Sequence, residues 1–79
     1  MKILLFGITK DIIGSGQLDL SLPAGMETVG ELRQFLKEQY KGLAALRSLA
    51  IAVDSEYAED GMKLSPSAEI ALIPPVSGG

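Results

Sequence analysis

The residues that could carry chemistry in this 79-residue chain are few, because it contains neither cysteine nor histidine. This composition excludes disulfides, thiolate nucleophiles and imidazole acid–base catalysis, and it removes the usual ligands of zinc and haem. We therefore expect no resident metal ion and no bound cofactor. The reactive groups that remain are carboxylates, hydroxyls, lysines and the ends of the chain.

Two short patterns superficially resemble ligand-binding loops. Gly14-Ser15-Gly16 lacks the third glycine of a dinucleotide loop, and a strand pattern follows it where a helix would be required, so it predicts a turn. The acidic stretch over residues 54–60 does not place a glycine and a terminal glutamate at the offsets of a calcium loop. No serine has a histidine to activate it. The side chains therefore predict no active site.

The C-terminal segment indicates a different kind of chemistry. After Ile73 the chain continues with Pro74, Pro75, Val76, Ser77, Gly78 and Gly79. The prolines lack amide donors and should end the sheet, whereas the glycines place no bulk beside the terminal carboxylate. We predict a flexible tail, residues 74–79, that enters a partner's narrow site with the Gly79 carboxylate as the reactive group. A frayed end without function is the alternative interpretation.

A partner would have to activate the Gly79 carboxylate, because a carboxylate is a poor electrophile. An acyl-adenylate made from ATP would serve this purpose. A sulfur or nitrogen nucleophile could then displace AMP, so the chemistry at the tail depends on partner enzymes.

Hydrophobic periodicity predicts the elements that must hold this tail. The apolar run over residues 2–8 predicts a central strand covered on both faces. Leucines that alternate with polar residues over 18–22 predict a second strand with one wet face. A loop of moderate length should join the two strands as a hairpin.

One amphipathic helix should follow the hairpin. Thr28 and Glu31 have the spacing of a capping box, so we expect a helix over residues 28–41. Gly42 suits the left-handed turn that ends such a helix. The apolar stripe of the helix comprises Val29, Leu32, Leu36 and Leu43.

Further strands are predicted at residues 49–53 and 69–73, with an edge pairing near Tyr57 and a brief strand or turn at 62–64. Strands on both sides of one main helix predict an α+β roll in which the helix packs across a mixed sheet. A chain of 79 residues is long enough for a single domain, residues 1–79.

The charge balance limits the partners. The formal net charge is −3 and the basic residues are scattered, which argues against a nucleic-acid surface. No apolar run approaches the ~20 residues of a membrane span, and the N-terminus lacks the features of a secretory signal. We expect a cytoplasmic protein that binds neither nucleic acid nor membranes.

Four segments together resemble a known family. KILLFGITKDIIG, TVGELRQFL, IAVD and the terminal EIALIPPVSGG resemble the small, sulfur-carrying subunits of molybdopterin synthase, which have the ubiquitin-like β-grasp fold. The resemblance spans essentially the whole chain, and PPVSGG is its most specific part. The chain is similar, more distantly, to the thiamine sulfur carrier and to ubiquitin-like modifiers, which share the fold and the Gly-Gly end.

This resemblance implies a reaction cycle. An adenylating enzyme of the ubiquitin-activating type would use ATP to adenylate Gly79, and a sulfurtransferase would convert the adenylate into a thiocarboxylate. The tail would then enter the large synthase subunit, within a heterotetramer, and donate sulfur to cyclic pyranopterin monophosphate. The chain itself would be a non-catalytic subunit. A protein modifier joined to lysines through Gly79 and an interaction module with an inert tail are the alternatives.

The resemblance also implies a docking surface on the sheet. The residues that match the family's hydrophobic patch are Phe6, Tyr57 and Ile73, extended by Pro74, Pro75 and Val76. Phe6 and Ile73 could instead be core residues, and Tyr57 an ordinary edge residue. An exposed apolar cluster would favour the docking surface.

Overall fold

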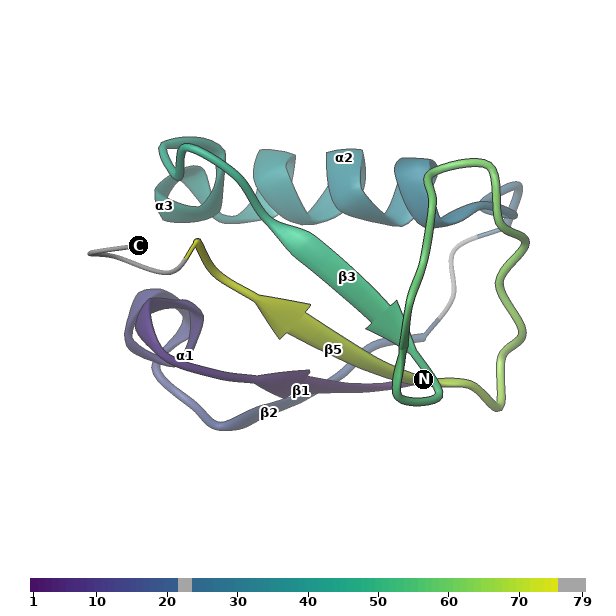
Figure 1. Ribbon diagram of the computed structural model, residues 1–79, viewed down its shortest axis with the longest axis horizontal. Helices are drawn as coiled ribbons and strands as arrows, with labels where there is room; N and C mark the ends of the chain where they lie inside the picture. Colours follow the sequence, from purple (N-terminus) through teal and green to yellow (C-terminus); the bar gives the residue numbers. More distant parts are fainter. Residues whose placement is uncertain (22–23, 76–79) are drawn as a thin grey trace.

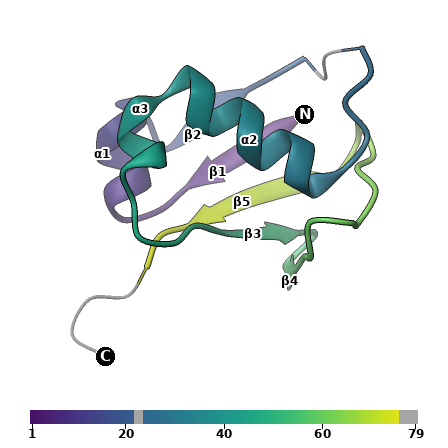
Figure 2. The ribbon, with the colours of Figure 1, turned by 90° about the horizontal axis from the view of Figure 1, so that it is seen from above.

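The computed structural model describes residues 1–21 and 24–75. Within these residues the chain forms a mixed five-stranded sheet, with strand order β2-β1-β5-β3-β4 and the long helix α2 across one face (Figure 1, Figure 2). In chain order the elements are β1 (Lys2–Leu5), α1 (Ile8–Ile13), β2 (Gln17–Asp19), α2 (Val29–Gln39), α3 (Lys41–Ala44), β3 (Ala50–Val53), β4 (Glu56–Tyr57) and β5 (Glu69–Ile73).

Strand β5 lies at the centre of the sheet. It pairs in parallel with β1, where Leu72 lies beside Leu5, and antiparallel with β3, where Leu72 lies beside Ile51. The outer strands β2 and β4 pair antiparallel with β1 and β3. The prediction of a mixed sheet with one main helix across it is confirmed, and β5 has the predicted bounds.

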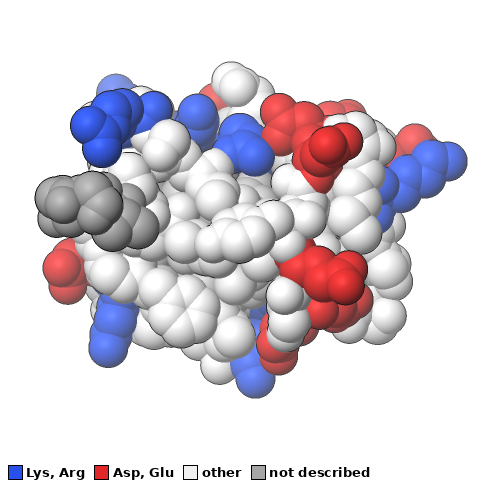
Figure 3. All heavy atoms as spheres, in the orientation of Figure 1, with Lys and Arg blue, Asp and Glu red and all other residues white. Residues whose placement is uncertain are grey.

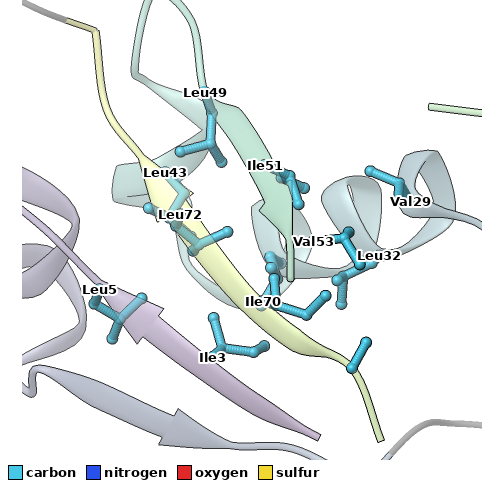
Figure 4. Packing of buried hydrophobic residues seen from close by; sticks show 12 residues of the cluster. Ile3, Leu5, Val29, Leu32, Leu43, Leu49, Ile51, Val53, Ile70 and Leu72 are labelled. Atoms are coloured by element: carbon cyan, nitrogen blue, oxygen red, sulfur yellow. The ribbon is translucent and has the colours of Figure 1, made fainter. Parts of the chain in front are cut away.

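The core lies between α2 and the sheet (Figure 4). Helix α2 begins at the predicted capping box: the Thr28 hydroxyl accepts a hydrogen bond from the Glu31 amide at 3.2 Å, and the Glu31 carboxylate accepts one from the Thr28 amide at 3.1 Å. Val29, Leu32 and Leu36 on α2 are fully buried, and burial stabilises the fold by about 1.5–3 kcal/mol for each such side chain. Their sheet partners in the core are Ile3, Leu5, Ile51, Val53, Ile70 and Leu72.

The first strand is shorter than predicted, and a helix replaces much of the expected loop. Strand β1 ends at Leu5 and buries only one face, and residues 8–13 form α1. Gly7, with φ 54° and ψ −134°, turns the chain out of the strand, and Gly14, with φ 88°, ends the helix. The prediction of a strand over 2–8 with both faces covered is therefore wrong. A short apolar run does not distinguish a strand from a strand followed by a helical turn.

Gly42 has a different role from the predicted one. Helix α2 ends at Gln39, and Tyr40, with φ −127°, separates it from α3. Gly42 lies inside α3, where an added Cβ would be 2.8 Å from Cγ2 of Ile12 on α1. The glycine thus permits a close approach of two helices, and the predicted left-handed stop at Gly42 is wrong. Leu43, which the periodicity assigned to the stripe of the main helix, is fully buried but belongs to α3.

The remaining strand predictions agree with the structure in position. Strand β3 begins at Ala50, Tyr57 pairs with Ala52 through β4, and Lys63 forms an isolated antiparallel bridge with Thr28. Strand β2 is an exception: it covers residues 17–19, so the strand predicted over 18–22 begins near the right place but ends too late, since residues 20 and 21 are outside it. Leu22, at the end of the predicted strand, lies outside the described residues. Among the helices of the described part, none has the length and apolar character needed to cross a membrane.

Candidate functional site

The point where the chain leaves the sheet is built by β5 and two prolines. Ile73 is the last residue of β5, and Pro74 and Pro75, both half-buried, follow it. Neither proline has an amide donor, so the sheet ladder cannot continue through them. The other tail residues that the sequence singles out lie outside the described part of the chain: Val76, Gly78 and Gly79. Their roles stay predictions.

The sheet face opposite α2, which we call the outer face, is largely apolar. Ile70 and Leu72 of β5 point into the core, so strand alternation places Ala71 and Ile73 on the outer face. The pairing register continues this surface across four strands, because Leu4, Ala71, Ala52 and Tyr57 are successive partners in one row. In the next row Ile73 lies beside Ala50. Alanines thus occupy the middle of the outer face, and larger side chains lie around them.

Tyr57 projects from the edge of this face. It is 75% exposed, although it pairs with the buried Ala52. The turn that presents it has Asp54 at φ 50° and Ser55 at φ 72°, the positive values that a type I′ hairpin requires at both central positions. Oδ1 of Asp54 accepts a hydrogen bond from the Glu69 amide at 3.0 Å, which ties the turn to the start of β5. The position of Tyr57 is therefore well defined.

Phe6 and Ile73 both lie outside the buried core. Phe6, immediately after β1, is 51% exposed, and Ile73 is half-buried. Neither belongs to the hydrophobic cluster between the sheet and α2. The core interpretation of these two residues is therefore wrong, and their role in docking stays a prediction.

Charge is distributed unevenly around the outer face. Figure 3 shows an uncharged middle over β3 and β5. Lysine and arginine atoms gather at the upper left, with others at the lower left, the bottom and the right edge, whereas most acidic atoms lie towards the right, with one group at the left edge. Figure 1 shows that α1, α3 and the end of β5 lie at the same end of the molecule. Lys10 and Lys41 are on these two helices, whereas Asp54, Glu56 and Glu69 cluster around the β3–β4 turn at the other end. An apolar surface with charges at its rim is typical of protein–protein interfaces.

Among the described residues, one ion pair joins helix α2 to the loop after β4. Nη2 of Arg33 lies 2.9 Å from Oδ1 of Asp60, and Nη1 of the same guanidinium donates to the Leu49 carbonyl. The arginine therefore links α2 to the segments on either side of β3 and β4. A separate hydrogen-bond network at the start of α2 lowers the pKa of Glu31, chiefly because the Glu27 amide donates to its carboxylate. That carboxylate stabilises the helix terminus and is not on the outer face.

The described residues offer a surface and not an enclosed site. Within residues 1–21 and 24–75, no group of three or more acidic or other ligating side chains could hold a metal ion. The same part of the chain contains no pocket. The described part of the chain presents the apolar outer face, and the chain leaves the sheet at Pro74, beside that face.

Two residues at this exit were not predicted from the sequence. Gly7 and Thr9 form the turn after β1, and an added Cβ on Gly7 would lie 3.1 Å from Cγ of Pro74. The available signal was a glycine inside the strand-like apolar run over residues 2–8, followed by threonine two positions later. Glycine in this setting favours a turn.

Comparisons with known proteins place the chain among relatives of similar length. A family model, described as the ThiS family, matches residues 3–79. The chain is 37% identical over 82 residues to the molybdopterin synthase sulfur carrier subunit of Caenorhabditis briggsae, covering 100% of this chain and 96% of that one. It is 35% identical over 83 residues to the subunit of the same name from Homo sapiens, covering 100% and 93%.

Solved structures show the same arrangement of elements. The putative molybdopterin converting factor, subunit 1, from Pyrococcus furiosus has a TM-score of 0.81 at 20% identity, with 95% of each chain covered. Small archaeal modifier protein 1 from Methanosarcina acetivorans has a TM-score of 0.78 at 25% identity, with 99% of this chain and 94% of that one covered. The expected ubiquitin-like β-grasp fold is confirmed by these similarities.

Proposed function

The chain belongs to the ThiS family, and from that membership we propose that it is the sulfur carrier subunit of a molybdopterin synthase in the cytoplasm. The observation that carries the proposal is the full-length similarity to curated subunits of that name. The apolar outer face and the proline pair after β5 support it, because a carrier needs a docking surface next to a tail that leaves the sheet.

The proposed reactive group is the carboxylate of Gly79. In an adenylating enzyme of the ubiquitin-activating type, a carboxylate oxygen attacks the α-phosphate of ATP and pyrophosphate leaves, which gives an acyl-adenylate. A persulfide on a sulfurtransferase then attacks the acyl carbon and displaces AMP. A thiol supplies the two electrons that cleave the resulting acyl persulfide and release the Gly79 thiocarboxylate. Gly78 leaves the approach to the acyl carbon free of side-chain bulk.

The thiocarboxylate would donate its sulfur in the large synthase subunit. The sulfur attacks cyclic pyranopterin monophosphate, and hydrolysis of the acyl bond returns the carboxylate to the tail. The residues proposed to dock on the large subunit, in a heterotetramer, are Phe6, Tyr57, Ile73, Pro74, Pro75 and Val76. The small subunit then contributes the sulfur, and the large subunit contributes the side chains that act on the pterin.

A protein modifier joined to lysines through Gly79 is the second candidate. The likeness to small archaeal modifier protein 1 favours it, since that protein is named a modifier. A thiamine-type sulfur carrier would use the same activated tail. The three functions share the adenylation step and differ in what receives the activated acyl group or its sulfur.

Intact-mass spectrometry after incubation with ATP, an adenylating enzyme and a sulfur source tests the proposal. Replacement of one terminal oxygen by sulfur supports a carrier, and subsequent formation of molybdopterin with the large subunit supports this particular pathway. Adducts to lysine support the modifier instead. If a verified cognate adenylating enzyme leaves the mass unchanged, both functions are contradicted.

The matched control is a chain that lacks Gly79. It should fold like the full chain, because residues 1–75 contain the whole described core, and it should not be converted to a thiocarboxylate. Full molybdopterin-forming activity in this truncated chain would contradict the carboxylate mechanism.

A further inference from the structure

The turn that follows β1 replaces a continuation of the sheet. Strands β1 and β5 pair in parallel up to Leu5 and Leu72, so the same register would bring Gly7 opposite Pro74. The chain turns instead: the Thr9 amide donates to the Phe6 carbonyl at 3.1 Å and closes a four-residue turn over residues 6–9. With φ 54° and ψ −134°, Gly7 has the backbone conformation of the first central position of a type II′ turn, where glycine is strongly preferred.

Thr9 fixes this turn through its side chain. Its hydroxyl accepts a hydrogen bond from the Phe6 amide at 2.9 Å and donates one to the Phe6 carbonyl. Both backbone polar groups of Phe6 are thus bound to one side chain. Among the described residues, Thr9 is the only buried polar one, with no exposed surface. A buried hydroxyl is costly unless it is hydrogen-bonded, so its use here indicates that the conformation of the turn matters.

The turn contacts the first residue of the tail. An added Cβ on Gly7 would lie 3.1 Å from Cγ and 3.9 Å from Cδ of Pro74, so the proline ring packs directly on the backbone of Gly7. A proline has no amide donor and a nearly fixed φ, so packing of its ring helps to set its direction. A Cβ at position 7 would require the Pro74 ring to move by a few tenths of an ångström, and it would also strain the positive φ of the turn.

We propose that the 6–9 turn is a seat for Pro74 that directs the tail towards a partner's active site, with Gly7 and Thr9 as positioning residues. This inference rests on the proposed function, because the tail must react in a partner. The carrier docks by its outer face, and its tail leaves the sheet in a fixed direction. The terminal carboxylate then has fewer orientations to sample before it reaches the reaction site. Orientation of this kind is a large part of rate enhancement, and a misplacement of ~1 Å can cost about 100-fold.

The first experiment measures adenylation of full-length Gly7→Ala by the adenylating enzyme. The methyl group would meet the Pro74 ring and would also strain the positive φ of residue 7. We expect kcat to fall at least about tenfold, with KM for the carrier changed much less, because the row from Leu4 to Tyr57 across the outer face is unchanged. The matched control is Gly14→Ala, which has the comparable strain of φ 88° at the other end of α1 but has nothing within 4 Å of the added Cβ. Its kcat should stay near that of the wild type.

A second set of variants keeps the test decisive if Gly7→Ala folds poorly. Thr9→Val removes the hydroxyl that binds Phe6 and should reduce kcat, whereas Thr9→Ser retains it and should restore kcat. In a double-mutant cycle, Pro74→Ala should make the loss from Gly7→Ala smaller, because the two side chains would no longer meet. Equal losses in Gly7→Ala and Gly14→Ala, or strict additivity with Pro74→Ala, would overturn the proposal.

A nuclear magnetic resonance measurement separates this proposal from the proposed function. In the wild type we expect nuclear Overhauser contacts between the Gly7 α-protons and the Pro74 ring, kept in Gly14→Ala and lost in Thr9→Val. If the wild type is never adenylated, the proposed function fails while these contacts still support the seat. If the contacts are absent from the wild type, or survive in Thr9→Val, the seat is wrong whatever the carrier does.

Discussion

Gly42 on α3 lies directly against Ile12 on α1: a Cβ added to the glycine would be 2.8 Å from Cγ2 of the isoleucine. This contact joins the short helix after the 6–9 turn to the end of the helical layer that covers the sheet. The ring of Pro74 lies against Gly7 in that turn. Helix α1 therefore lies against α3 through Ile12, and its N-cap residue Gly7 lies against Pro74 at the exit of the chain.

Replacement of Gly42 by alanine should destabilise the protein despite the higher helix propensity of alanine. Propensity favours alanine by about 0.5–1 kcal/mol in a helix, whereas an extra methyl group forced into a packed site costs about 1–3 kcal/mol. We expect the free energy of unfolding, measured with urea, to fall by about 1–2 kcal/mol. Gly61→Ala is the control, since nothing lies within 4 Å of its added Cβ. A Gly42→Ala protein as stable as the wild type would show that α1 can shift freely.

Tyr57→Ala should weaken binding to the large synthase subunit without affecting the fold. Tyr57 is 75% exposed, so its loss should change the free energy of unfolding by less than about 0.5 kcal/mol. An aromatic side chain that becomes buried in an interface can contribute about 2 kcal/mol or more to binding, which predicts a loss of affinity of tenfold or greater. Calorimetric titration measures the affinity. Met62→Ala, which truncates another exposed apolar residue outside the outer face, is the control, and equal effects of the two would identify Tyr57 as an ordinary edge residue.

The parts of the fold that local sequence signals determine could be predicted well. The capping box at Thr28 and Glu31 placed the start of α2, because both hydrogen bonds join residues three apart. Pro66, between Ser65 and Ser67 in the loop before Glu69, and the prolines after Ile73 delimited β5 through similarly local signals. Gly42 was misinterpreted because its role depends on Ile12, thirty residues away in the chain, and a glycine after an amphipathic stripe looks the same in either role.

The candidate site could be predicted only in part. The family resemblance pointed to Phe6 and Ile73, but the sequence could not decide whether they lie in the core or on the surface. That choice depends on where β1 ends, and Gly7 ends it through a turn that the apolar run concealed. The contact between Gly7 and Pro74 joins residues at opposite ends of the chain, and it exists because β1 and β5 are parallel neighbours. Periodicity along the sequence carries no information about such a pairing.

The stability contributed by Glu31 should depend on pH. Hydrogen bonds from the Glu27 amide, the Thr28 hydroxyl and the Thr28 amide lower the pKa of its carboxyl below the ordinary 4.5. The unfolded chain then binds the proton more tightly than the folded one, so the contribution is complete above pH 4.5 and is lost as the pH falls through the lower folded pKa. The difference in free energy of unfolding between the wild type and Glu31→Gln should therefore be constant near neutral pH and shrink on acidification. Glu38→Gln corrects for the loss of one charge on the same helix, and a difference that grows with acid would contradict the assignment.

Pro75→Ala should weaken binding to the large subunit through entropy. Pro75 is half-buried at the exit, and alanine there gives the unbound tail more backbone freedom, which must be lost on docking. A proline restricts the free chain by about 0.4–1 kcal/mol, so we expect the affinity to fall by about two- to fivefold, with the loss in the entropy of binding measured by calorimetry. Pro66→Ala is the matched control, because Pro66 is exposed in the loop before β5, near the opposite end of that strand. Unchanged affinity for Pro75→Ala, or the same loss for Pro66→Ala, would show that the stiffness of the exit does not contribute to docking.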